Sequence, residues 1–285
     1  MKVLIFGNGY VGKRCQAAWP DAVLSDVRVT SKEEALEEIR RQQPDVVLNA
    51  AGVKGKPNVD WCDSHPFETM RGNVLMPLLL ADACADAGVY LLHIGSGCIF
   101  YGEAPHPDKA WREDDFGNPS PVYSRNKWAA DLVLSTLPNV GIARIRMPID
   151  SIPGPGNYIT KVAHYPKLME IENSVTILDD LPAVLHALLE RRATGIFHAT
   201  NPGTVKLQDL IALYEELVDP THTCEWIREE DLVPMGLAKK PRSNNVLASE
   251  RLAALGIAMR PVHEALRDTM EKYARAKRQA AASAS

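Results

Sequence analysis

The stretch KVLIFGNGYVG, from Lys2 to Gly12, opens the chain with an apolar run that is followed at once by glycines. The run KVLIF is typical of a central strand in a parallel sheet. The glycines stand between this strand and a predicted helix over 13–19, a setting in which they allow a tight turn and the close approach of a pyrophosphate to the helix N-terminus. The stretch therefore predicts a dinucleotide-binding unit. The alternative is a glycine-rich turn that binds no ligand.

Further strand and helix patterns alternate along the chain after this unit. Short apolar runs predict strands at 22–24, 46–48, 91–94, 140–145, 195–199 and 224–227. Helical patterns occur at 31–41, 67–87, 121–137, 158–168, 181–192, 207–218, 249–255 and 261–277, and polar loops at 54–65 and 102–120. This alternation predicts an α/β fold with a Rossmann-type doubly wound parallel sheet. Apolar Trp128, Leu132 and Val133 recur at helical spacing, which predicts that their helix face packs on the sheet.

The regular alternation loosens after Ile149, and this change suggests how the chain is divided. We expect an NADP(H)-binding Rossmann domain over 1–149, joined by parts of 175–205 and by the C-terminal helix. A smaller α/β part over 150–270 is expected to bind the substrate. The Ala/Ser-rich tail over 278–285 is expected to fray.

Composition and charge narrow the classes of function. The formal net charge is −4 and no long basic run occurs, so neither nucleic acid nor a membrane surface is expected as a partner. The five cysteines form no CxxC pair, which indicates neither a disulfide framework nor a zinc site, and we expect no metal. Reduced thiols suit the cytoplasm. No signal peptide and no apolar stretch of transmembrane length are recognised.

The identity of the dinucleotide depends on two side chains that follow the second predicted strand. Asp26 is placed to bind the adenosine ribose of NAD, whereas Arg28 is suited to the 2′-phosphate of NADP. We expect NADP(H), with NAD(H) left open. The small residues of NAAG after the third strand let the backbone lie along a cofactor. The expected cofactor-binding residues are Gly7, Asn8, Gly9, Tyr10, Val11, Gly12, Asp26, Arg28, Asn49, Ala50, Ala51, Gly52, Tyr123, Lys127 and Met147.

The stretch LLHIGSGCIFY, from Leu91 to Tyr101, places two reactive side chains at the end of a buried strand. Ser96 and Cys98 flank a glycine there, and ligands bind beyond the carboxyl ends of parallel strands. A small-residue bend with a core cysteine is the alternative. Tyr123 and Lys127 stand four residues apart on a predicted helix, so they share one face. Taken alone, that pair is more typical of a helix surface.

These motifs, in this order, resemble the extended short-chain dehydrogenase/reductase superfamily. In such a site a lysine ammonium favours the phenolate of a tyrosine, whose reference pKa is about 10. The resemblance implies that Tyr123 donates a proton to a ketone oxygen, that Lys127 supports it, and that Ser96 binds the carbonyl. Hydride transfer to the ketone carbon would come from NADPH.

A closer resemblance extends from residue 1 to about 270. The stretches that carry it are NAAG with the following PNVDWC, GCIF, RMPI, ITK, NSVTILD, TNPG and PRSNN. They resemble the nucleotide-sugar 3,5-epimerase/4-reductase of UDP-rhamnose biosynthesis, the C-terminal half of plant rhamnose synthases. dTDP-4-dehydrorhamnose reductase and GDP-fucose synthase are more distantly similar. Cys98 is the feature that favours an added epimerase step over a simple reductase.

This resemblance implies two reactions at one site. A nucleotide-linked 4-keto-6-deoxyglucose, carried on UDP or dTDP, would be epimerised at C3 and C5 with Cys98 as base and Lys161 as acid. Reduction at C4 would give the nucleotide-L-rhamnose. Two alternatives stay open: a 4-reductase without epimerase activity, and a non-catalytic, cofactor-bound regulatory subunit.

Further residues are expected to bind the nucleotide sugar, and a homodimer is expected from helices 67–87 and 121–137. A packing role for Cys62 and a structural turn at 241–245 are the alternatives for parts of this set. The expected substrate-binding residues are Lys54, Asn58, Cys62, Asn157, Arg242 and Asn245.

Overall fold

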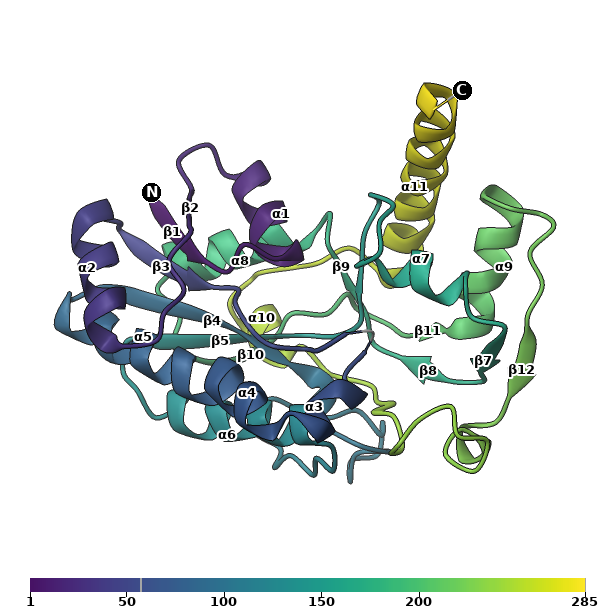
Figure 1. The fold of residues 1–285 in the computed structure, drawn as a ribbon, viewed down its shortest axis with the longest axis horizontal. Helices are drawn as coiled ribbons and strands as arrows, with labels where there is room; N and C mark the ends of the chain where they lie inside the picture. Colours follow the sequence, from purple (N-terminus) through teal and green to yellow (C-terminus); the bar gives the residue numbers. More distant parts are fainter. Residues whose placement is uncertain (57, 285) are drawn as a thin grey trace.

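Six parallel strands form the central sheet of the computed structural model, which describes residues 1–56 and 58–284 (Figure 1). Their order is β10-β5-β4-β3-β1-β2, and every neighbouring pair is parallel. The strands are β1 (Val3–Phe6), β2 (Val23–Ser25), β3 (Val46–Asn49), β4 (Tyr90–Ser96), β5 (Val140–Ile145) and β10 (Gly195–His198). The predicted α/β Rossmann-type sheet is confirmed.

Helices cover both faces of this sheet, because the apolar strand residues alternate between the two faces. Val3 and Ile5 pack in one cluster with residues of α1 and α8, whereas Leu4 and Phe6 pack in another with residues of α2, α5 and α6. The helices are α1 (Tyr10–Ala18), α2 (Lys32–Gln42), α5 (Met76–Asp86), α6 (Val122–Leu134) and α8 (Leu181–Glu190). This two-sided cover buries β1, β3 and β4 along their whole lengths.

The helix predicted over 67–87 contains a turn of π-helix. It runs as α4 (Pro66–Met70), η1 (Arg71–Leu75) and α5 without a break. Asn73 on η1 binds both backbone groups of Val53: its Oδ1 accepts from the N–H at 2.9 Å and its Nδ2 donates to the C=O at 2.6 Å. The widened turn therefore fixes the segment that follows β3, and π-turns often occur at functional sites.

The second half of the chain adds a smaller layer beside the sheet (Figure 1). Three short pairings, β6–β9, β7–β12 and β8–β11, frame it. Its core contains Ile159, Leu210 and Leu266. The elements are β6 (Pro148–Ile149), α7 (Tyr158–Val162), β7 (Lys167–Met169), β8 (Glu172–Asn173), β9 (Thr176–Ile177), β11 (Val205–Lys206), α9 (Leu207–Leu217), β12 (Glu225–Ile227), η3 (Glu229–Asp231), α10 (Glu250–Ala254) and α11 (Val262–Ala284).

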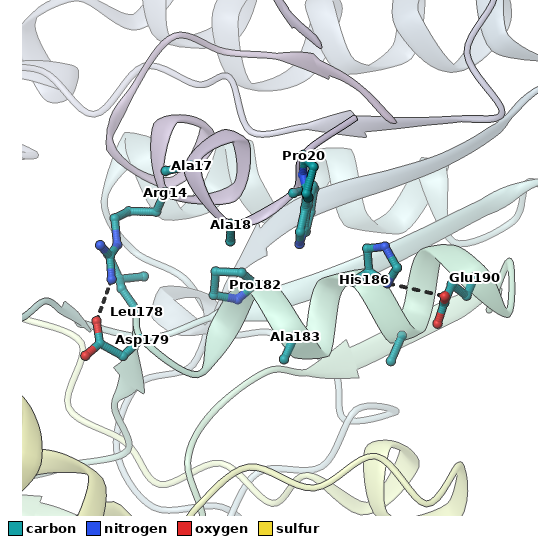
Figure 2. A pocket seen from close by; sticks show the side chains of 12 residues that line it. Arg14, Ala17, Ala18, Pro20, Leu178, Asp179, Pro182, Ala183, His186 and Glu190 are labelled. Carbon is teal, nitrogen blue, oxygen red and sulfur yellow. Dashed lines mark hydrogen bonds and ion pairs between the residues drawn. The ribbon is translucent and has the colours of Figure 1, made fainter. Parts of the chain in front are cut away.

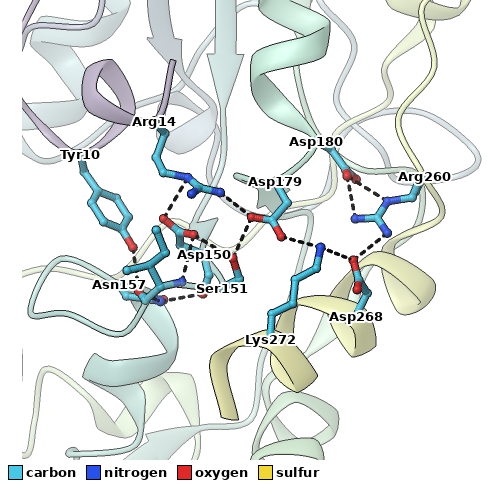
Figure 3. A network of polar contacts seen from close by, with 11 residues as sticks. Tyr10, Arg14, Asp150, Ser151, Asn157, Asp179, Asp180, Arg260, Asp268 and Lys272 are labelled. Atoms are coloured by element: carbon cyan, nitrogen blue, oxygen red, sulfur yellow. Dashed lines mark hydrogen bonds and ion pairs between the residues drawn. The ribbon is translucent and has the colours of Figure 1, made fainter. Parts of the chain in front are cut away.

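A chain of charges connects the first helix to the last one (Figure 3). Arg14 on α1 lies 3.4 Å from the buried carboxylate of Asp150 and also pairs with Asp179. Asp179 in turn accepts from Lys272 on α11 at 3.0 Å. These bonds hold the glycine-motif helix against the second half of the chain.

Three predicted elements differ from the structure. The helix predicted over 158–168 ends at Val162, because Pro166 lacks the N–H that a longer helix needs, and β7 begins directly after it. The loop predicted over 54–65 contains the short helix α3 (Asp60–Ser64). The tail predicted to fray from 278 continues α11 as far as Ala284, in keeping with the high helix propensity of alanine.

The face of α6 that meets the sheet was also predicted wrongly. Leu132 and Val133 are 43% and 46% exposed. The buried side chains of α6 include Lys127 and Asp131 instead. Asp131 accepts a hydrogen bond of 2.8 Å from the fully buried Arg144 on β5, and this tertiary ion pair overrides the apolar pattern.

Candidate active site

The three glycines of the first turn have three different surroundings. Gly7 has a φ of +113°, and a Cβ there would lie 2.4 Å from the backbone N of Ala51. A Cβ on Gly12 would lie 2.1 Å from the carbonyl oxygen of Gly7. A Cβ on Gly9 would meet no atom within 4 Å, so this side of the turn is open. Because no side chain caps the first turn of α1, its N–H groups are available to an anion such as a pyrophosphate.

A cavity of about 750 Å³ adjoins this turn. Asp26 and Arg28 both lie on its wall with exposed side chains, and neither forms an ion pair within the described ranges. Arg71, on the π-turn, adds a second guanidinium to the wall. The lining also includes Gly7, Asn8, Ala51, Gly52, Val53 and Trp61. The open turn and the free charges beside it fit a dinucleotide with its adenosine end in this cavity.

A second hollow, of about 620 Å³, lies between α1 and α8 (Figure 2). Half of its lining residues are Ala or Pro, and a His186–Glu190 pair with a partly exposed imidazole also lines it. None of the predicted site residues lines it. We therefore assign the candidate site to the glycine turn and the ends of β3 and β4.

The end of β4 places Ser96 and Cys98 side by side. Ser96 is the last strand residue, and its Oγ accepts from the backbone N of Cys98 at 3.2 Å. A short 3₁₀ turn, η2 (Gly97–Ile99), follows. A Cβ on Gly97 would lie 2.6 Å from Leu247 Cδ1, so close packing explains this glycine. The turn leaves Cys98 partly exposed, whereas Cys62 is fully buried.

Tyr123 and Lys127 approach this strand end from α6. Burial, and next the charge of Cys98, raise the pKa of Tyr123, while a hydrogen bond with Ser96 opposes the rise. The expectation that Lys127 favours the phenolate is therefore not met, because burial outweighs it. Burial lowers the pKa of Lys127 to about 8 against the opposing effects of Asp131 and Cys98. The structure therefore brings together the predicted Ser–Tyr–Lys set and the predicted cysteine.

The side chain of Lys127 is fixed by contacts with residues of β4. Its Nζ donates to the Ile94 carbonyl at 2.8 Å and lies 3.2 Å from His93 Nε2. The other ring nitrogen of His93 lies 3.1 Å from Asn49 Nδ2. Burial, and next the charge of Lys127, hold the pKa of His93 well below its usual range. The imidazole is therefore neutral and serves as a spacer between β3 and α6.

Lys161 lies on α7, away from the strand end in sequence. Its side chain is half-buried, and burial followed by repulsion from Lys54 lowers its pKa. An ammonium with a lowered pKa releases and regains a proton more readily near neutral pH. No hydrogen bond or ion pair joins Lys161 to Cys98 or Tyr123 among the described residues, and its acid–base role stays a prediction.

Several predicted ligand-binding side chains have structural partners. Asn49 is fully buried and its Oδ1 accepts from Ala51 N at 3.0 Å, so it shapes the turn after β3. Asn157 caps α7 and donates to the carbonyls of Asp150 and Ile152 at 2.7 and 2.8 Å. Asn245 donates to the carbonyls of Gly97 and Phe100 at 3.1 and 2.8 Å.

Two further predicted substrate residues, Arg242 and Asn58, lie around α3, and the predicted cofactor residue Met147 lies beside β6. Arg242 makes a bidentate pair with Asp60, at 2.6 and 2.8 Å. Asn58 Oδ1 accepts from Asp60 N at 2.9 Å and so begins α3. Met147 has a left-handed φ of +39° and packs against the core of the second half. Contact of Arg242 and Asn58 with a substrate, and of Met147 with the cofactor, stays a prediction.

Two side chains near the end of β4 were not predicted from the sequence. His93 interrupts the apolar run of β4, and a polar residue inside a buried strand was the available signal. Arg146 belongs to the RMPI stretch, but nothing in the sequence indicated that its guanidinium reaches Cys98 Sγ at 2.9 Å.

Comparison with known proteins agrees with this arrangement. The model of the RmlD substrate binding domain family matches residues 1–275. The chain belongs to this family. It is 38% identical over 259 residues to the bifunctional dTDP-4-dehydrorhamnose 3,5-epimerase/dTDP-4-dehydrorhamnose reductase of Arabidopsis thaliana, covering 87% of this chain and 85% of that protein.

Longer plant proteins and solved structures extend the similarity of this RmlD family member. A trifunctional UDP-glucose 4,6-dehydratase/UDP-4-keto-6-deoxy-D-glucose 3,5-epimerase/UDP-4-keto-L-rhamnose-reductase of Arabidopsis thaliana is 34% identical over 88% of this chain, which spans only 39% of that protein. The solved UDP-rhamnose synthase of Acanthamoeba polyphaga mimivirus is 29% identical, with a TM-score of 0.88 over 95% of this chain and 99% of its own. A Bacillus anthracis dTDP-4-dehydrorhamnose reductase in complex with NADP shares the fold at 18% identity, with a TM-score of 0.81 over 96% and 99% of the two chains.

These findings confirm the resemblance drawn from the sequence. At the level of the family, the relatives are enzymes of nucleotide-sugar chemistry, namely epimerases, reductases and a UDP-rhamnose synthase. Within residues 1–56 and 58–284, no helix combines the length and the apolar character that crossing a membrane requires. No group of three or more His, Cys, Asp or Glu side chains in the same ranges is placed to hold a metal ion.

Proposed function

We propose that this chain is a bifunctional 3,5-epimerase/4-reductase that converts a nucleotide-linked 4-keto-6-deoxyglucose, carried on UDP or dTDP, to the nucleotide-L-rhamnose with NADPH. The observation that carries the proposal is the shared strand end. Cys98 lies two residues beyond Ser96, and both sit beside Tyr123. A site for reduction alone needs the serine and the tyrosine but has no use for a partly exposed thiol.

The first reaction moves protons and no other atoms. The C3 and C5 protons of the sugar are acidic because each carbon is adjacent to the C4 ketone. The Cys98 thiolate takes a proton from one face of the carbon, and the electron pair moves onto the ketone oxygen as an enolate. The ammonium of Lys161 returns a proton to the opposite face, which inverts the centre. Each positioned acid or base contributes about 10²–10⁴ in rate.

The second reaction reduces the ketone at C4. A nicotinamide cofactor bound at the glycine turn would supply the hydride. Tyr123 delivers the proton to the oxygen, and Ser96 orients the carbonyl. Lys127 assists the proton transfer from Tyr123. Burial raises the pKa of Tyr123, so the phenol is protonated and ready to donate before reduction.

The choice of NADPH rests on the wall of the cavity. Arg28 presents an exposed guanidinium there, and guanidinium groups suit a phosphate. Asp26 on the same wall suits a ribose hydroxyl, as in NAD. We propose that the domain over 1–149, joined by β10 and α8, holds this cofactor, and that the part over 150–270 holds the nucleotide sugar.

Two substrates distinguish the bifunctional enzyme from a 4-reductase. One is the nucleotide 4-keto-6-deoxyglucose and the other is the already epimerised nucleotide 4-keto-L-rhamnose. We expect the wild-type chain to oxidise NADPH with either substrate and to form the nucleotide-L-rhamnose from both, identified by chromatography and NMR. The Cys98→Ala variant is expected to reduce only the second substrate. If the wild type converted only the second substrate, the chain would be a 4-reductase without epimerase activity.

A homodimer and a cytoplasmic location complete the proposal. Exposed apolar side chains gather on α4, η1 and α6, the helices predicted to pair: Phe67, Met70, Leu75, Leu132 and Val133. The five cysteines stand as free thiols, which suits a reducing compartment. We expect sedimentation to show a dimer that Leu132→Glu converts to a monomer. A wild-type monomer at micromolar concentration would refute the dimer.

A further inference from the structure

The guanidinium of Arg146 is in contact with Cys98, the candidate base. Arg146 follows β5 and is 3% exposed. Its Nη1 donates to Cys98 Sγ at 2.9 Å. Its Nη2 donates to Asn173 Oδ1 at 2.5 Å and also to the Ser243 carbonyl. The sulfur is therefore one of three acceptors for a buried cation.

Arg146 has no carboxylate partner among residues 1–56 and 58–284. Two residues earlier, Arg144 is equally buried but pairs with Asp131 at 2.8 Å. The acceptors around Arg146 are a neutral amide, a neutral carbonyl and the sulfur, and its Nε has no hydrogen-bond partner. A buried charge without a counterion is costly. The thiolate of Cys98 is the anion that the contacts of Arg146 offer as that counterion.

Separate elements fix the positions of the Arg146 guanidinium and the Cys98 thiol. The backbone N of Arg146 donates to Thr176 Oγ1 at 3.0 Å, which ties it to β9. A Cβ on Gly97 would lie 3.3 Å from Arg146 Cδ, so the side chain runs closely past the turn that carries Cys98. Asn245 holds the carbonyls of Gly97 and Phe100 from the other side. The contact between guanidinium and sulfur is thus built into the framework.

Other titratable groups also face this pair. Tyr123 and Lys127 on α6 and Tyr101 beyond β4 sense the charge of Cys98. Tyr101 and Tyr158 on α7 sense the charge of Arg146. Burial raises the pKa of Tyr101 to about 12 and that of Tyr158 further, so both phenols are neutral near pH 7. Lys127 is the second cation near the sulfur, and Arg146 is the one that donates a hydrogen bond to it.

We propose that Arg146 is the positioning residue for Cys98: its guanidinium stabilises the thiolate and aims the sulfur, so epimerisation depends on Arg146 and reduction does not. A hydrogen-bonding cation beside a thiol raises the fraction present as thiolate. The role of Arg146 in epimerisation rests on the proposed function. Stabilisation of the thiolate by Arg146 can be tested without substrate.

Alkylation of Cys98 by iodoacetamide measures the thiolate directly. An ordinary thiol is about 3% thiolate at pH 7. We expect Arg146→Met to alkylate Cys98 at least fivefold more slowly than the wild type at pH 7 and to approach its rate near pH 10. The peptide that contains Cys98 is followed by mass spectrometry, which separates it from Cys224. Arg146→Lys should restore most of the rate.

Two further variants keep this test decisive. Asn173→Asp offers Arg146 a carboxylate with little change in shape, and it should slow alkylation in the same direction. Lys240→Met removes a cation that pairs with Asp63 and not with the sulfur, and it should leave the rate unchanged. Equal alkylation rates for the wild type, Arg146→Met and Asn173→Asp across pH 6–10 would overturn the inference.

A kinetic comparison separates this inference from the proposed function. With 4-keto-6-deoxyglucose substrate, Arg146→Met should lose at least tenfold in deuterium uptake at C3 and C5. With 4-keto-L-rhamnose substrate, its NADPH oxidation should stay within threefold of wild type. Equal loss of both activities refutes the positioning role. Absence of deuterium uptake in the wild type itself refutes the epimerase, while the alkylation result still decides whether Arg146 stabilises the thiolate.

Discussion

Lys127 should make the stability of this protein rise with pH above neutrality. The side chain is 4% exposed, and burial lowers its pKa from 10.5 to about 8. The unfolded chain therefore holds a proton on this residue between pH 8 and 10.5 that the folded chain has already released. Because stability rises with pH wherever the unfolded state binds more protons, the destabilising effect is fully present below pH 8 and disappears as pH approaches 10.5.

The size of the effect follows from the two pKa values. A difference of about 2.5 in pKa, from 10.5 to about 8, corresponds to ~3.4 kcal/mol at 1.36 kcal/mol per pKa unit. About 3 kcal/mol of this is present at pH 8 and roughly 1 kcal/mol is left at pH 10. The wild type should therefore gain about 2 kcal/mol between these two pH values from this residue alone.

Substitution of Lys127 by Met isolates that contribution. The free energy of unfolding is measured by denaturant titration at several pH values for the wild type and for Lys127→Met. The difference between them should change by about 2 kcal/mol from pH 8 to pH 10 in favour of the wild type. Lys240→Met, on a more exposed lysine paired with Asp63, serves as the matched control and should show little change. A difference between wild type and Lys127→Met that is flat across this range would show that Lys127 is not desolvated as described.

Three further results are expected. Tyr123→Phe should lower NADPH oxidation by about 10²–10⁴ while deuterium uptake at C3 and C5 continues, and equal loss of both would contradict separate roles. Gly9→Ala should keep the melting temperature but weaken NADPH binding at least tenfold, whereas Gly12→Ala should lower the melting temperature, because its Cβ would lie 2.1 Å from a carbonyl oxygen. Arg28→Ala should raise the Kd for NADPH by about tenfold or more and spare NADH, and Asp26→Ala should do the reverse. Calorimetric titration with both cofactors measures these Kd values. An equal change in the Kd for NADPH and for NADH in Arg28→Ala would show that Arg28 does not bind the 2′-phosphate.

The fold could be predicted from local patterns in the sequence. Buried parallel strands are short continuous apolar runs, and glycines after the first of them have one common structural use. Ser96 and Cys98 could be placed for the same reason, since the carboxyl end of a parallel strand is where ligands bind. Tyr123 and Lys127 needed only helical spacing to be put on one face. These inferences depend on residues that are neighbours in the sequence.

Features set by distant partners could not be predicted in this way. Asp131 is turned toward the sheet by Arg144, against an apolar pattern that favoured Leu132 and Val133. Arg146 meets a sulfur 48 residues away. Asn157 looked free to bind a substrate, but its amide is used by backbone carbonyls of its own loop. Sequence patterns report which residues are polar or small, whereas partners across the fold decide which of them stay free.

We propose that one strand end serves two consecutive reactions on the same ketone. The most direct test is a reaction of the nucleotide 4-keto-6-deoxyglucose with NADPH in deuterated water, with the product examined by NMR. We expect deuterium at both C3 and C5 of the nucleotide-L-rhamnose from the wild type, and no labelled product from Cys98→Ala. A wild-type product that carries protium at C3 and C5, or a fully labelled product from Cys98→Ala, would show that Cys98 is not the base of an epimerase.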